Sequence, residues 1–440
     1  MKHVPRGQPN SLPICFSGEC GCSAAPELRR IYEASTSAEA LNPDLTELVS
    51  RIFDCLRALV QSQTITSPED LGVALGAVFD LCMSLLYAER CTHTQWLYCP
   101  QGPIASFYPY TRSCPRCGRT DDLPSVAHKP ASDSIGRYAS LCLSAILAEI
   151  CQRTRTGWNV RLLAAGRGEI DMILFSAELV VLCELKASPL TAFPICVFYE
   201  EPLTTEVDGE PQEVITHKAT DVPTWKTQPL HLYLLGSGET LPLHATVRNG
   251  KASLIPSLLS REQDQLVEDI KAVIEVWRQM FVGYESRWIK AGHLRWFTFG
   301  CGGGVDDSKN APGLDRTDDI KKGLYQSLKL TEEYRTRCAQ RRVQVALLSN
   351  LHPVVHYTKY LQGFEDALWT HEAKLAEDKS DPEWRRVRAS DLSPFYDMLL
   401  TLTKSWFRCE TLKYAFSLQQ LYSALGGSDD DFQRPMDTFF

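Results

Sequence analysis

Three charged side chains lie at one end of two short apolar segments near the middle of the chain. The segments are EIDMILF (169–175) and ELVVLCELK (178–186), and the side chains are Asp171, Glu184 and Lys186. Hydrolysis of a phosphodiester uses carboxylates that hold divalent metal ions, and a nearby lysine can orient the water and offset developing charge. The residue types therefore predict metal-dependent phosphodiester hydrolysis.

Strand geometry decides whether these side chains can meet. Alternate residues of a strand share a face, so Glu184 and Lys186 point the same way. An even-numbered loop centred on Ala177 and Glu178, or a bulge, would place Asp171 opposite Glu184, whereas an odd-numbered loop would separate them. Both faces of the two segments are otherwise apolar, which indicates strands inside a sheet. Burial of the three charges at the end of such strands is costly unless a metal and a phosphate compensate it.

The pattern resembles the motif of the PD-(D/E)XK nuclease superfamily, which includes most type II restriction endonucleases. That motif is an Asp, a gap of roughly ten to twenty residues, and Asp/Glu-x-Lys on the adjacent strand. Here twelve residues separate Asp171 from Glu184-Leu185-Lys186, and Ile170 replaces the usual preceding Pro. The resemblance implies that Asp171 and Glu184 hold Mg²⁺ and that Lys186 assists the attacking water.

Many members of the superfamily carry a further acid on the helix before the hairpin, and Glu149 in LSAILAEICQR is the candidate catalytic residue. The alternative is that Glu149 lies on a solvated helix face. The resemblance also implies a type II restriction endonuclease that cuts double-stranded DNA as a cytoplasmic homodimer, with a DNA methyltransferase encoded nearby. Three alternatives stay open: a DNA repair or junction nuclease, a non-catalytic zinc-containing DNA-binding module with a nuclease-like core, and a hairpin with only a structural salt bridge.

Two other segments are candidates for contact with the substrate. Asp307-Ser308-Lys309 also has the Asp-x-Lys pattern of the motif, but it follows a run of glycines. This context predicts a flexible loop near the substrate and not a rigid metal site. Arg295, Trp296 and Phe299 could line a DNA groove or belong to the core.

A helix is expected over 317–338. It begins with acidic residues, which favour a helix N-terminus. Its stripe of Lys322, Gln326 and Lys329 lies nearly opposite its apolar side chains, and these residue types bind phosphates or base edges. The alternative is a solvated face. The stretch LDRTDDIKKGLYQSLKL (314–330) resembles a segment of ApaLI-like restriction enzymes.

A cysteine-rich region precedes the hairpin. Cys91, Cys99, Cys114 and Cys117 lie in an aperiodic stretch, and SCPRCGR resembles half of a zinc ribbon. Cys-x2-Cys matches the edge of a zinc tetrahedron, which predicts a structural Zn²⁺ ion. His93 could replace Cys91 as a ligand. The alternative is a set of reduced, unliganded thiols.

Composition sets the broad limits. The chain has 440 residues, a net charge of −8 and sixteen cysteines. A local excess of twelve Lys/Arg over seven Asp/Glu in 286–349 leaves a DNA-binding face compatible with this charge. No secretory signal, membrane-spanning run or nucleotide-binding P-loop is found, which favours a cytoplasmic protein and disfavours a helicase–nuclease fusion. Cysteines within apolar runs are expected in the core, namely Cys55, Cys82, Cys142, Cys151, Cys183 and Cys196.

The order of elements predicts an α/β or α+β fold: a restriction-endonuclease-like mixed sheet flanked by helices, with helical N- and C-terminal regions and a zinc-ribbon-like insertion. The expected organisation is a loosely ordered segment (1–40), a helical hairpin with the cysteine-rich region (41–130), the catalytic core (131–350), a helical region (351–425) and an acidic tail (426–440). An acidic loop is expected near 200–224.

Overall fold

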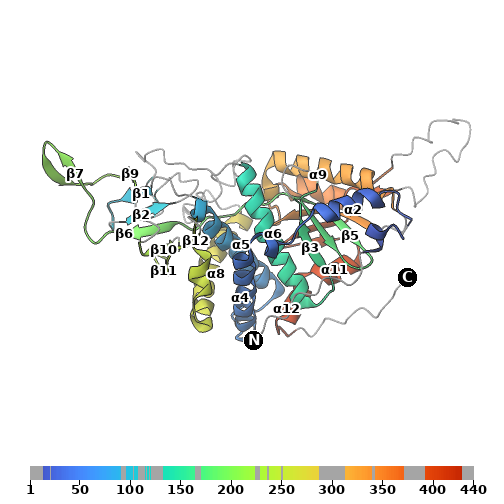
Figure 1. Cartoon of the computed structure of the whole chain (residues 1–440), viewed down its shortest axis with the longest axis horizontal. Helices are drawn as coiled ribbons and strands as arrows, with labels where there is room; N and C mark the ends of the chain where they lie inside the picture. The colour runs from blue at the N-terminus through green and yellow to red at the C-terminus, as the bar shows by residue number, and fades with distance from the viewer. Residues whose placement is uncertain are drawn as a thin grey trace, which may run out of the picture.

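The computed structural model describes residues 13–19, 21–90, 96–102, 104–107, 114, 116–117, 119, 132–163, 170–222, 228–234, 237–248, 251–286, 313–338, 342–370 and 392–428. The protein is a mixed α/β structure with two six-stranded sheets, and a group of long helices lies between them (Figure 1). We call the sheet that contains the 169–186 hairpin the main sheet, and the other the second sheet.

The main sheet has the order β18-β17-β14-β5-β4-β3. The three strands that come first in the chain, β3, β4 and β5, form an antiparallel meander. β14 and β17 run parallel to β5, and β18 is antiparallel to β17. The strands are β3 (Asn159–Leu162), β4 (Met172–Phe175), β5 (Val180–Leu185), β14 (Val343–Ser349), β17 (Met398–Thr401) and β18 (Trp406–Phe407). The predicted mixed sheet is therefore present, and the hairpin lies inside it.

Helices cover both faces of the main sheet. The side chains of one face belong to a core that also contains residues of α4 (Pro43–Gln61), α5 (Pro68–Arg90), α6 (Ser132–Thr154), α11 (Glu410–Phe416) and α12 (Leu418–Ala424). The other face packs on α1 (Ile14–Ser17), α2 (Ala25–Ala34) and α9 (Thr317–Leu330). The alternation predicted for the hairpin is confirmed, because Met172, Leu174, Val181 and Cys183 lie in the first core and Ile173, Phe175, Val180 and Leu182 in the second.

Side-chain caps fix the starts of the first two long helices, which form the predicted helical hairpin. Ser67 Oγ accepts the amide of Asp70 at 3.1 Å, so it caps α5. Asn42 caps α4 in the same way, through the amide of Leu45. The predicted helix at 317–338 is α9 followed by a π-helical turn (Thr331–Arg335), and the long helix α8 (Gln263–Ser286) precedes it in the chain.

Asp80 joins α5 to the segment that follows the hairpin. Its buried carboxylate accepts the amides of Leu190 (3.2 Å) and Thr191 (2.8 Å) and the indole N–H of Trp277 on α8 (2.7 Å). A buried carboxylate with several donors ties distant segments strongly, because each unsatisfied donor would cost free energy. Asp80 thus fixes the path of the chain after β5.

The second sheet is antiparallel, with the order β11-β10-β6-β2-β1-β9. Its strands are β1 (Trp96–Cys99), β2 (Ile104–Phe107), β6 (Ile195–Phe198), β9 (Lys218–Thr220), β10 (Leu230–Tyr233) and β11 (Thr240–Leu243). The small hairpin β12 (Thr246–Arg248) and β13 (Lys251–Ser253) leads to α7 (Ile255–Leu259) and α8.

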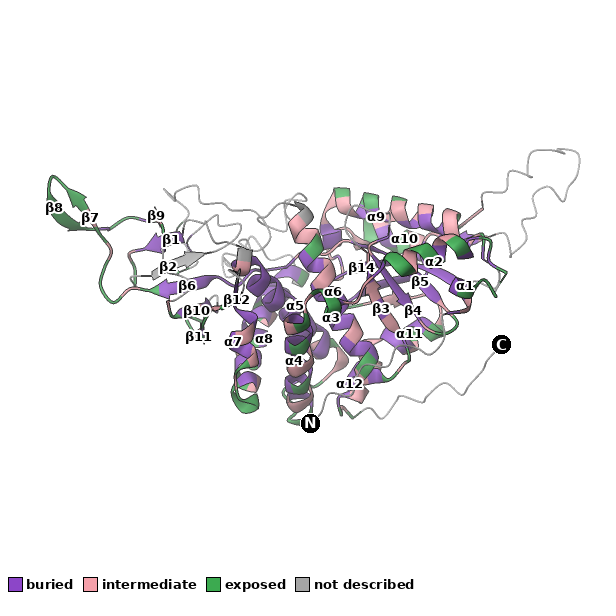
Figure 2. Ribbon diagram, in the orientation of Figure 1, coloured by how far each residue is buried: buried purple, intermediate pink, exposed green. Residues whose placement is uncertain are grey.

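The expected acidic loop is not a loop throughout. Between β6 and β9 the chain forms a two-stranded hairpin, β7 (Thr204–Val207) and β8 (Glu210–Glu213), which we call the arm. Its turn has positive φ at Asp208 (52°) and Gly209 (83°), the conformation that an Asp-Gly pair favours. The arm projects from the end of the molecule and is exposed along almost all of its length (Figure 2).

The N- and C-terminal regions differ from their predictions. Residues 13–41 form α1, α2 and α3 (Ala38–Leu41), so much of the segment expected to be loosely ordered is helical. The 351–425 region contributes β17 and β18 to the main sheet, together with β15 (Leu368–Trp369), β16 (Ser393–Pro394), α10 (Gln362–Glu365), a π-helical turn (Tyr357–Leu361), α11 and α12. Strands of two to four residues are too short to produce a recognisable period.

The six cysteines expected in the core are all buried and free. A disulfide that the spacing did not predict joins Cys22, ahead of α2, to Cys338, beyond α9. The guanidinium of Arg337 also donates to the Ser23 carbonyl (3.0 Å) and pairs with Glu27 (3.0 Å). These contacts hold the N-terminal helices against the main sheet.

Among the described residues, two helices are long and apolar enough to cross a membrane, although no membrane-spanning run was expected from the sequence. They are Pro68–Glu89 and Ser134–Thr154, and 94% and 61% of their apolar windows are buried within the fold. Core helices of soluble proteins pass the same test. Both contribute to the hydrophobic core that contains one face of the main sheet.

Candidate active site and metal cluster

The turn between β4 and β5 decides the geometry of the hairpin. Phe175 pairs with Val180, so four residues (176–179) connect the strands, and the predicted even-numbered loop is confirmed. Met172 pairs with Cys183, and one further step of this register sets Asp171 against Glu184. The amide of Asp171 donates to the Cys183 carbonyl at 3.0 Å, so the strand contact extends to this residue.

The three predicted side chains interact at the end of the hairpin. Asp171 Oδ2 accepts the amide of Leu185 at 2.8 Å. The carboxyl groups of Asp171 and Glu184 lie on opposing sides of the hairpin and affect each other's pKa. The ammonium of Lys186 pairs with Glu184. The amide of Lys186 donates to the Leu348 carbonyl on β14 (2.9 Å), which fixes this end of the strand. The structure therefore brings Asp171, Glu184 and Lys186 together.

Both carboxyl groups hold protons more tightly than exposed acids do. Burial raises the pKa of Asp171, although the Leu185 amide and Lys186 oppose the shift. Burial, followed by the negative charge of Asp171, raises the pKa of Glu184 to about 7, although Lys186 opposes it. Two adjacent buried carboxylates with one lysine are an electrostatically incomplete group, which a cation would complete.

The α9 helix lies over the same face of the sheet as this group. Gly323 makes the close approach, because a Cβ atom there would lie 3.1 Å from Leu347 Cδ2 and 3.8 Å from Lys186 Cγ. The start of α9 is anchored at Gly313, whose amide donates to Ser188 Oγ at 2.8 Å. The side-chain amide of Asn350 accepts the backbone N–H of Ser188 and donates to its carbonyl. The ends of β5, β14 and α9 thus form one packed unit.

The three predicted DNA-contacting residues lie on α9. Lys322 is exposed, and Gln326 and Lys329 are half-buried. Lys322 directly precedes Gly323, the residue of α9 that approaches Leu347 and Lys186. Tyr325, 64% exposed, extends the same surface and was not singled out in the sequence.

Glu149 has a different environment from the one expected. It lies on α6, on the opposite side of the main sheet, and is buried. Its Oε1 accepts Arg153 Nε (2.7 Å) and Ser50 Oγ on α4 (3.1 Å). These contacts satisfy its charge without a metal, so Glu149 is neither on a solvated face nor joined to Asp171 and Glu184.

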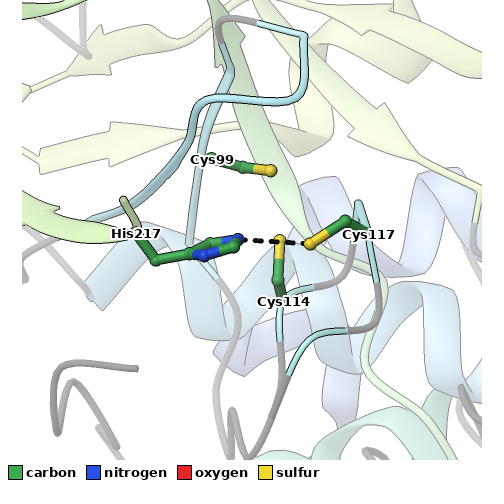
Figure 3. A group of neighbouring side chains, drawn as sticks. All are labelled: Cys99, Cys114, Cys117 and His217. Atoms are coloured by element: carbon green, nitrogen blue, oxygen red, sulfur yellow. Dashed lines mark hydrogen bonds between the residues drawn. The ribbon is translucent and has the colours of Figure 1, made fainter. Parts of the chain in front are cut away.

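A second group of potential metal ligands lies in the second sheet. Cys99, Cys114, Cys117 and His217 point toward one another, and their ligand atoms all lie within 4.8 Å of one another (Figure 3). Cys117 Sγ and His217 Nε2 are 3.2 Å apart. The proximity of Cys99 and Cys114 lowers the pKa of Cys99, and together with burial it raises that of Cys114. The Cys3His cluster could bind a metal ion such as zinc.

The cluster contains three of the four predicted cysteines, and its fourth member is His217. Sequence reasoning missed His217 because it lies 100 residues beyond Cys117. The only local signal was its place directly before a short strand. Cys91 and His93, the expected fourth ligands, lie outside the described residues, as do Arg295, Trp296, Phe299, Asp307 and Lys309.

No family model, curated protein or solved structure matches this chain.

Proposed function

We propose that the protein is a Mg²⁺-dependent endonuclease that hydrolyses phosphodiesters of double-stranded DNA at specific sites, as type II restriction endonucleases do. The observation that carries the proposal is the meeting of Asp171, Glu184 and Lys186 on one face of a buried hairpin. The mixed sheet, with an antiparallel hairpin and a parallel neighbour β14, supports the PD-(D/E)XK resemblance.

The donor set fits Mg²⁺. Asp171 and Glu184 offer carboxylate oxygens, the ligands that this hard cation prefers, and burial raises the pKa of both groups. When bound, the ion would neutralise the phosphate and lower the pKa of a water molecule. A rigid position for both oxygens follows from the hairpin register and from the Leu185 amide on Asp171.

Lys186 has a separate role in the proposal. Its side chain is 20% exposed and pairs with Glu184, so its ammonium can reach both the acid and an incoming phosphate. In that position it orients the attacking water and offsets negative charge that develops on the phosphate oxygens. Gly323 keeps α9 close enough to restrict the lysine stem.

DNA would lie along α9. Lys322 supplies a positive charge to the backbone, and Gln326 and Lys329 continue that face of the helix. Homodimerisation is part of the proposal because palindromic recognition sites match a two-fold axis. A cytoplasmic location and a neighbouring methyltransferase gene belong to the same proposal.

The Cys3His cluster fits a different metal. Thiolate and imidazole ligands suit zinc, whereas the carboxylate pair suits Mg²⁺. Four protein ligands leave no open position, which is typical of structural zinc. We assign zinc to this cluster and the hydrolytic metal to the carboxylates.

The proposed function is tested by incubating plasmid DNA with the full chain in the presence of Mg²⁺ or of EDTA. The Glu184→Gln variant is the negative control. Discrete fragments that require Mg²⁺ and are absent with Glu184→Gln would support a site-specific nuclease. A smear, or cutting of branched substrates alone, would favour a repair or junction nuclease. Binding without cleavage on a broad panel of DNA would overturn the proposal in favour of a binding module.

A further inference from the structure

The Cys3His cluster lies where three separate segments meet at one edge of the second sheet. Cys99 is the last residue of β1, Cys114 and Cys117 belong to the SCPRCGR turn, and His217 immediately precedes β9. β1 pairs with β9 at Tyr98 and Lys218, so one further step of that register sets Cys99 against His217. The strand pairing itself therefore brings two of the ligands together.

The edge that these ligands occupy has few other contacts to hold it. β9 has only three residues, pairs only with β1 among the described strands, and contains no fully buried side chain. Short edge strands of this kind contribute little stability of their own. A metal bound by Cys99 and His217 would link both strands, and the two remaining thiolates would attach the turn.

The turn is joined to the sheet at a second point. The guanidinium of Arg116, between the two cysteines of the turn, donates to the hydroxyl of Tyr233 on β10 at 3.3 Å. The amide of Cys114 donates to the Arg119 carbonyl at 2.9 Å. The turn therefore bridges the β9 edge and β10, and the cluster fixes one side of this bridge.

The base of the arm lies next to one of these ligands, His217. The arm leaves the sheet after β6 and returns directly to His217. Its other fixed points are the Leu203 amide, which donates to Tyr98 Oη at 2.9 Å, and the buried side chain of Val214. Because both arm strands are largely exposed, its direction depends on these few contacts.

We propose that a single Zn²⁺ ion bound by Cys99, Cys114, Cys117 and His217 is the folding determinant of the β1–β9 edge and of the base of the arm. The main sheet contributes no ligand to the cluster and has its own cover of helices. Loss of zinc therefore loosens the edge, the turn and the arm while β4, β5 and β14 stay folded. This inference does not depend on the nuclease proposal.

Metal analysis of the purified full chain tests the ligand set. The wild type is expected to contain about one zinc per chain, and His217→Ala and Cys117→Ser should each lose most of it. His231→Ala is the matched control, since His231 lies on β10 of the same sheet and outside the cluster. Absence of zinc from a chain produced with zinc, or equal zinc in His217→Ala and His231→Ala, would overturn the assignment.

Hydrogen exchange tests the folding role and remains informative if a variant fails to fold. The wild-type chain is compared before and after zinc is removed by a chelator and after zinc is restored. Amides of 96–99 and 218–220 should lose protection at least tenfold and regain it with zinc, while those of 172–175, 180–185 and 343–349 stay unchanged. Unaltered protection at the β1–β9 edge, or equal loss in the main sheet, would contradict the inference. Neither readout requires DNA cleavage.

Discussion

Asp171 and Glu184 face each other across the β4–β5 hairpin, and the negative charge of Asp171 adds to burial in raising the pKa of Glu184. The pair is buried. Lys186 is the one cationic side chain among the groups that shift the pKa values of the two acids. Because the interior penalises two adjacent carboxylates, the hairpin alone gains little from this arrangement. A metal ion bound between the two carboxyl groups, as proposed, would offset this cost.

Proton binding at Glu184 should make stability depend on pH. The folded chain raises this pKa from 4.5 to about 7, so between these values it holds a proton that the unfolded chain releases. Stability therefore falls as pH rises through the window. Without divalent ions, Glu184→Gln should match the wild type in thermal midpoint near pH 5 and exceed it near pH 7.5. An equal difference at both pH values would refute the assigned shift.

Glu149→Gln should separate stability from hydrolysis. The substitution weakens the buried contact with Arg153, which should cost about 1–3 kcal/mol of unfolding free energy. The cleavage rate should stay within about threefold of the wild type, because the side chain lies across the sheet from Asp171. Urea unfolding and cleavage kinetics measure the two effects. Loss of cleavage in a folded Glu149→Gln protein would restore Glu149 to the catalytic group.

Gly323→Val should displace α9 from the site. A side chain at this position meets Leu347 and Lys186, so overpacking should cost about 1–3 kcal/mol and shift the lysine. Misplacement by about 1 Å can lower a rate roughly a hundredfold, and a loss of at least about tenfold in cleavage is expected. Gly136→Val on α6 is the control, since nothing lies within 4 Å of its Cβ position. Equal cleavage by both variants would exclude this role of Gly323.

Asp80→Asn should destabilise the fold from a distance. Both carboxylate oxygens of Asp80 accept N–H donors. In the Asn variant the NH2 group replaces one of these oxygens, so it would face an N–H donor that it cannot accept. The expected cost is about 2 kcal/mol or more in unfolding free energy, measured by urea denaturation. Glu47→Gln, at an exposed position of α4, should change it by less than about 0.5 kcal/mol. A stable Asp80→Asn protein would show that this junction is dispensable.

The local features of the hairpin could be predicted from the sequence. The apolar alternation of ELVVLCELK determines which residues share a face, and the SAEL turn has the even length that the chemistry requires. The long helices were also predictable, because caps such as Ser67 and apolar stripes are local signals.

Long-range contacts could not be predicted in the same way. Glu149 and Arg153 are four residues apart on α6, a spacing that favours an ion pair, but nothing near Glu149 in the sequence indicates that Ser50 on α4 would also bind it. His217 reaches the cysteines only because β9 pairs with β1. The arm, in contrast, had a signal in Asp208-Gly209 that the sequence analysis did not use.

Single-turnover cleavage of plasmid DNA by the wild type, Asp171→Asn, Glu184→Gln and Lys186→Met tests the central claim most directly. Each variant keeps the approximate shape of its side chain, and thermal unfolding checks that it is folded. The account predicts that Mg²⁺-dependent cleavage falls roughly a hundredfold or more in all three variants. Cleavage within about threefold of the wild type by folded Glu184→Gln and Lys186→Met proteins would contradict the account.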